Sequence, residues 1–119
     1  MTKMLKKSMN KPEEIRDFPN GKLKLVKLEE VTFGLATFEP GWKWSESMKP
    51  TAKTESCQAG HTNYHLSGTL HVKMDDGTEM EFGPGDIGEI PPGHDAWVIG
   101  DEPVVALDIT GMVDYAKEA

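Results

Sequence analysis

The stretch LHVKMDDGTEMEF, residues 70–82, contains the clearest local signal for the fold. Apolar and polar side chains alternate before and after Asp76-Gly77, and a period of two is typical of strands with one buried face. An Asp-Gly pair between two alternating segments favours a tight turn. The stretch therefore predicts a β-hairpin.

Short apolar segments continue on both sides of this hairpin, and Gly or Pro residues separate most of them. The segments cover 22–28, 31–39, 87–90, 96–99 and 104–109. Many short strands without a long amphipathic helix indicate an all-β sandwich or closed barrel. We expect two packed antiparallel sheets that bury Leu70, Val72, Phe82, Ile90, Val98 and Leu107. A short C-terminal helix over 112–119 follows from the composition of that segment.

A chain of 119 residues is long enough for one domain with one sizeable core. We expect this domain over 12–119, with its core over 22–110. Residues 1–11 contain four lysines and no acidic residue, so they predict a flexible basic arm. The apolar residues of the arm are too few to anchor the chain stably in a membrane.

The whole chain is acidic, with 13 Lys and Arg against 20 Asp and Glu and a net charge of -7. Negative charges on nucleic acids and anionic membranes repel such a chain, so we expect neither as a partner. One cysteine cannot form an internal disulfide, and no apolar run resembles a secretory signal or a transmembrane helix. These features predict a cytoplasmic protein.

Several segments together resemble the cupin family. They are YHLSG at 64–68, the hairpin at 70–82, GPGD at 83–86 and IPPG at 90–93. The spacing of Gly85, Pro91 and Gly93 matches the family's second motif, whose closing histidine position holds Ala96, while His94 lies two residues earlier. The resemblance covers roughly 38–110 by the spacing of its turns and strands. It implies a double-stranded β-helix jelly roll. The chain also resembles small stand-alone cupins with no assigned reaction.

The resemblance also implies a metal site with altered residues. In the family's first motif a His-x-His pair and a Glu bind the metal, and counting back from Gly68 places these positions on Glu55, Cys57 and His61. With His94 they form a set of four residues that can all act as ligands. Sulfur and nitrogen donors favour zinc, or alternatively iron, over magnesium or calcium. The alternatives are a buried structural cysteine and a His94 that caps the Pro-Pro-Gly turn.

Other polar and aromatic residues are candidates for a ligand pocket. Asn63 and His65 share strand parity with His61, so they would face the same interior. Trp42 and Trp44, and likewise Trp97, could form a wall against which a ligand stacks, and the alternative is that they only pack in the core or close the barrel.

These residues leave three functions open. The first is a small-molecule-binding cupin with a divalent transition metal (zinc or iron) in its pocket, and the alternative is a metal-dependent cupin enzyme of the oxygenase, isomerase or lyase type. In the third, Cys57 is a nucleophile that His61 activates. Exposed sheet edges and the resemblance predict a homodimer.

Overall fold

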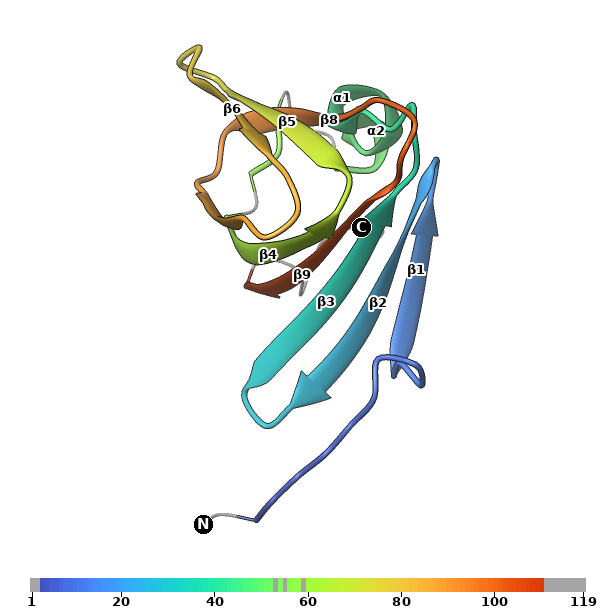
Figure 1. The fold of residues 1–119 in the computed structure, drawn as a ribbon. Helices are drawn as coiled ribbons and strands as arrows, with labels where there is room; N and C mark the ends of the chain where they lie inside the picture. Colours follow the sequence, from blue (N-terminus) through green and yellow to red (C-terminus); the bar gives the residue numbers. More distant parts are fainter. Residues whose placement is uncertain (1–2, 53, 55, 59, 111–119) are drawn as a thin grey trace.

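The computed structural model describes residues 3–52, 54, 56–58 and 60–110, and this part of the chain is mainly antiparallel β-structure (Figure 1). Its strands are β1 (Glu14–Phe18), β2 (Gly21–Leu28), β3 (Val31–Phe38), β4 (His61–Ser67), β5 (Thr69–Met74), β6 (Glu79–Phe82), β7 (Ile87–Ile90), β8 (His94–Ile99) and β9 (Val104–Thr110). Two short helices, α1 (Trp44–Ser47) and α2 (Lys49–Ala52), lie between β3 and β4.

The strands form two sheets. One has six strands in the order β1-β2-β3-β9-β4-β7, and the other has three in the order β6-β5-β8. The chain passes from the first sheet to the second at Gly68, where φ is +75° and a Cβ would overlap the backbone of Pro103. The core lies between the sheets, as in a jelly roll, so the expected all-β class is confirmed.

The hairpin expected at Asp76-Gly77 is present. Leu70 pairs with Phe82 across β5 and β6, and Gly77 has a φ of +95°. The expected core residues Leu70, Val72 and Ile90 are buried, and Phe82 and Val98 pack against them partly buried.

Leu107 does not belong to this core, and the prediction for it was wrong. The inward side chains of β9 are Val104, Ala106 and Asp108, which are all buried. Because neighbouring residues of a strand point to opposite faces, Leu107 lies on the outer face of the six-stranded sheet, where it is half-buried.

The structure adds elements that the sequence did not suggest. Strand β1 precedes the expected core and pairs with β2, and α1 and α2 occupy a stretch in which no helix was expected. The helix expected over 112–119 lies outside the described residues. Among the described residues, no helix is long and apolar enough to cross a membrane.

Candidate metal centre

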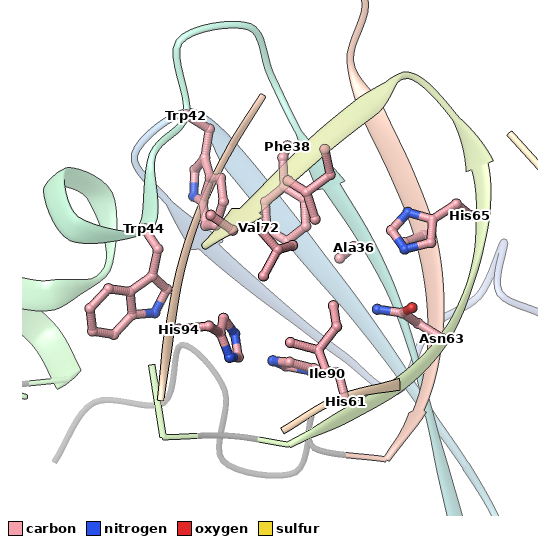
Figure 2. Close-up of a pocket in the computed structure, with 13 residues that line it drawn as sticks. Ala36, Phe38, Trp42, Trp44, His61, Asn63, His65, Val72, Ile90 and His94 are labelled. Carbon is pink, nitrogen blue, oxygen red and sulfur yellow. The ribbon is translucent and has the colours of Figure 1, made fainter. Parts of the chain in front are cut away.

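A cavity lies between the two sheets, and Figure 2 shows the side chains around it. Its walls are mainly apolar, and its polar residues are His61, Asn63, His65 and His94. The centre of a water molecule can occupy a volume of about 30 Å³ in this cavity. A second, larger hollow of about 260 Å³ lies beside β5, β6 and β7, and it shares Val72 and Ile90 with the cavity.

Cys57 and His94 are held opposite each other by their backbones. The two residues form an isolated antiparallel bridge, in which the Cys57 N–H donates to the His94 carbonyl at 2.7 Å. Directly opposed residues of such a bridge have Cβ atoms about 5 Å apart. The backbone partner of Cys57 is therefore His94.

His61 joins this pair from the beginning of β4. Its Nε2 lies 4.0 Å from the Cys57 Sγ, and its ring meets the His94 ring edge-on with 5.4 Å between centroids. One ligand atom from each of the three residues lies within 4.8 Å of the other two, and all three residues are buried. The structure thus brings Cys57, His61 and His94 to one point.

Both histidines have their Nδ1 atoms engaged on the side away from this point. His61 Nδ1 lies 2.7 Å from the Asp108 carboxylate, and His94 Nδ1 lies 2.9 Å from the Pro91 carbonyl oxygen. An ionised carboxylate and a carbonyl can only accept, so each Nδ1 must donate its hydrogen. Each Nε2 is then the nitrogen left to bind a metal, the arrangement common for metal-binding histidines.

The charge state of His61 follows from its neighbours. Burial disfavours the imidazolium, but hydrogen bonds with Asp108 and Cys57 favour it more strongly and raise the pKa of His61 to about 9. Without a metal His61 therefore carries a proton on Nε2 at neutral pH. A metal ion that binds there must displace this proton.

The three donors fit a zinc ion after a small contraction. With Zn–N bonds of about 2.0 Å and Zn–S bonds of about 2.3 Å, neighbouring ligands of a tetrahedral site lie about 3.3–3.6 Å apart. The observed Sγ to Nε2 distance of 4.0 Å, and the 4.8 Å limit for the set, exceed these distances by about 0.4 to 1.5 Å. Side-chain rotation can supply movements of that size.

The remaining predicted residues divide into three groups. Asn63, His65 and Trp44 line the cavity, although Trp44 does so from the beginning of α1 and not from a strand. Glu55 lies outside the described residues. Trp97 does not line the cavity: it stacks on His71 with 4.6 Å between ring centroids and lies beneath the Lys43 ammonium.

Sequence reasoning missed Asp108 and Phe38 as residues of the site, whereas it had named Trp42. Trp42 and Phe38 stack at 4.2 Å between ring centroids and line the cavity. Asp108 is 0% exposed, and a signal for it existed. It shares parity with Val104 and Ala106 in the apolar run VVALDIT, and an acid at an inward position of a strand needs a partner.

Solved structures share this architecture. A protein of unknown function from Rhizobium leguminosarum has a TM-score of 0.64 at 21% identity, and the match covers 92% of this chain and 97% of that one. A cupin-superfamily sugar phosphate isomerase from Silicibacter pomeroyi has a TM-score of 0.61 at 20% identity over 87% and 73% of the two chains. A cupin-like protein from Thermotoga maritima has a TM-score of 0.55 at 21% identity over 81% and 72%. No protein-family model and no curated protein sequence matches the chain.

Proposed function

Because this chain has the cupin fold, we propose that it holds one divalent transition metal in its cavity and binds a small molecule beside that metal. The proposed ligands are the Cys57 sulfur and the Nε2 atoms of His61 and His94. Zinc is the first choice and iron the alternative, because a donor set of one sulfur and two nitrogens suits both.

The observation that carries the proposal is the engagement of both Nδ1 atoms. Asp108 and the Pro91 carbonyl fix the orientation of the two imidazole rings, so that the His61 Nε2 faces the Cys57 sulfur and the His94 Nε2 is left to bind with them. A merely structural histidine has no need to present its second nitrogen to a buried sulfur. The Asp108 carboxylate also raises the basicity of His61 as a ligand.

Three protein ligands leave a tetrahedral ion one position for a water molecule or another small ligand. When bound, the metal supplies a Lewis acid that polarises an oxygen atom of this ligand. The chain positions that oxygen and limits its contact with bulk water, because the surrounding walls are apolar and mostly buried.

A metal-dependent enzyme of the isomerase, oxygenase or lyase type is the alternative. One observation favours it: His65 lines the same cavity, and burial lowers its pKa while the charges of Asp86 and Asp108 act in the opposite direction. A neutral imidazole at this position can accept a proton from a hydroxyl group of a molecule bound in the cavity. A search for turnover should therefore follow any demonstration of metal binding.

The structure supplies a third group for the hypothesis that Cys57 is a nucleophile. Asp108 orients His61 as the acid of a catalytic triad would. The 4.0 Å between Sγ and Nε2 is longer than the 2.6–3.2 Å typical of a nucleophile and its base. Cys57 is also only 3% exposed, which restricts a substrate's approach. The metal site fits this geometry better.

Metal content of the protein, purified without a histidine tag, tests the proposal. We expect about one zinc per chain after zinc loading, and cobalt substitution should give the intense absorption of a tetrahedral thiolate site. Cys57→Ser and His94→Ala should each remove most of the bound metal. His71→Ala is the matched control, because His71 bonds Glu79 and Glu81 at the surface and should not affect metal content.

A chain that takes up no metal, or that loses none in the Cys57→Ser and His94→Ala variants, would contradict the proposal. Circular dichroism of each variant establishes that a loss of metal does not come from unfolding. The nucleophile would then be the better explanation of the Cys57–His61 contact.

A further inference from the structure

The cavity has a second polar region, which the proposed metal centre does not use. His65 is 0% exposed, and neither of its ring nitrogens has a hydrogen-bond partner among the described residues. The Oδ1 of Asn63 and the Nε1 of Trp42 are also buried and without a partner there. Buried polar atoms nearly always have a partner, so these atoms indicate that the cavity holds a polar molecule.

Two of these polar residues, Asn63 and His65, face the cavity from the same strand. Asn63 and His65 follow His61 at every second residue of β4, and all three line the cavity. Figure 2 shows that the edge of the His65 ring with both nitrogens is turned toward the middle of the pocket. Phe82 stacks on this ring at 5.1 Å and nearly parallel, which holds its orientation.

The number of donors and acceptors restricts the chemistry of the ligand. A neutral His65 has one donor and one acceptor nitrogen, Asn63 Oδ1 is an acceptor and Trp42 Nε1 is a donor. A carboxylate only accepts and an ammonium only donates, so either would leave some of these atoms unpaired. A hydroxyl group both donates and accepts, and it adds no charge to a buried site.

The volume restricts the size. The centres of water molecules can occupy about 30 Å³ of the cavity. This space holds roughly two water molecules. A two-carbon compound with two hydroxyl groups is somewhat larger than two water molecules, so it is close to the largest ligand that a small movement of the walls can admit.

We propose that the cavity binds a compact, uncharged compound with two hydroxyl groups, one on His65 and Asn63 and the other toward the metal position. Only the second contact rests on the proposed metal function. The first contact depends on residues of β4 alone, so it can be tested in the metal-free protein.

The experiment uses nitrogen-15 NMR of histidine-labelled protein, both metal-free and zinc-loaded, with ethane-1,2-diol as the probe. Glycolate and ethylamine are matched probes with the wrong charge. We expect millimolar diol to shift the ring signals of His65 and not those of His71. Glycolate and ethylamine should bind at least about tenfold more weakly, since each leaves polar atoms unpaired.

His65→Phe retains a ring against Phe82 but removes both nitrogens, and it should weaken diol binding at least about tenfold while the metal content stays the same. Asn63→Leu provides the same test if His65→Phe does not fold. A diol that leaves the His65 signals unchanged, or three probes that bind equally well, would overturn the proposal. Loss of metal binding with an intact diol response would instead contradict only the metal function.

A different observation concerns the outer face of the six-stranded sheet. The strand registers place one residue of each strand in a single row across this face. In order, the row reads Ile15, Lys24, Leu35, Leu107, Tyr64 and Ile87. Ile15, Tyr64 and Ile87 are exposed by 50%, 44% and 78%, and Leu66 and Ile109 on the same face are exposed by 47% and 43%.

The row is nearly symmetric about its centre, which lies between β3 and β9. A two-fold axis along the strands at that centre would place Leu35 over Leu107 of the second copy and Ile15 over Ile87. It would also place the Lys24 ammonium over the Tyr64 ring, which is a favourable cation–π contact. A self-complementary surface of this kind is what a two-fold dimer requires.

The area is sufficient for a dimer. Six strands spaced about 4.8 Å apart, each about 20 Å long, present a flat face of roughly 600 Å² before side-chain relief is counted. Stable interfaces bury about 800 Å² on each partner, and exposed apolar patches of several hundred Å² mark interaction sites.

We infer that two copies of this chain pack through the outer face of the six-stranded sheet. Light scattering at tens of micromolar should give about 26 kDa, twice the chain mass of 13.2 kDa. Ile87→Glu and Tyr64→Glu should each give the monomer mass. Met80→Glu is the control, because Met80 is 60% exposed but belongs to the other sheet. A wild-type monomer, or face variants that remain dimeric, would overturn the inference.

Discussion

The Asp108 carboxylate lies 2.7 Å from the Nδ1 of His61, although the two residues are 47 positions apart in the chain. Strands β4 and β9 are neighbours in the sheet, and Asn63 pairs with Asp108. Asp108 therefore reaches His61 diagonally across the inner face. This contact joins an inward-facing carboxylate of β9 to the proposed metal ligand on β4.

Asp108→Asn should weaken zinc binding by about 10- to 100-fold, because the amide cannot hold the imidazole as a carboxylate does. Competition with a chromophoric chelator measures this change. His71→Ala serves as the reference variant. His71 also lies beside carboxylates, those of Glu79 and Glu81, but this contact is at the surface. Equal zinc affinities for Asp108→Asn and the wild type would show that Asp108 does not support the metal ligand.

The metal-free protein should lose stability as the pH rises from 6.5 to 9. The folded-state pKa of His61 is raised from 6.5 to about 9, so its protonation stabilises the fold fully below pH 6.5 and not at all above pH 9. The loss amounts to at most about 3 kcal/mol. Urea unfolding at several pH values measures it, and a free energy of unfolding that is constant over this range would contradict the assignment.

Zinc should protect Cys57 from alkylation. The metal-free Cys57 side chain is buried, so iodoacetamide should react slowly, through transient opening of the site. Bound zinc engages the sulfur directly and should reduce the rate by at least about tenfold. Mass spectrometry follows the modification. If zinc leaves the rate unchanged, Cys57 is not a ligand.

Gly68→Ala should destabilise the protein more than Gly77→Ala does. Both glycines have positive φ, but a Cβ at Gly77 meets open space, whereas a Cβ at Gly68 overlaps the Pro103 backbone. We expect about 1 kcal/mol for Gly77→Ala and about 3 kcal/mol or more for Gly68→Ala. Thermal unfolding compares the two variants, and similar melting temperatures would show that the turn at Gly68 can move.

The sequence predicted those parts of the fold that depend on local alternation and turn residues. The hairpin at Asp76-Gly77 is the clearest example, because a period of two and a turn signal agree there. The prediction for Leu107 was wrong because an apolar run does not show which parity faces the core. The same parity argument, applied from His94 through Ala96, would have placed Trp97 on the opposite face.

The candidate metal centre could be predicted only in part from the sequence. Family spacing identified Cys57 and His61, but the pairing of Cys57 with His94 depends on a contact between distant segments. The role of Asp108 depends likewise on the neighbouring positions of β4 and β9. Trp44 lines the cavity from α1, a helix too short for a periodic pattern to predict.

Val72 and Ile90 are the walls shared by the small cavity and the larger hollow beside β5, β6 and β7. These two apolar side chains therefore lie between the cavity beside the proposed metal position and the larger hollow. A molecule that passes from this hollow into the cavity must displace these two side chains, so the rate of that passage depends on their motion. Replacing either with alanine would then accelerate exchange in both directions, with less effect on the affinity at equilibrium.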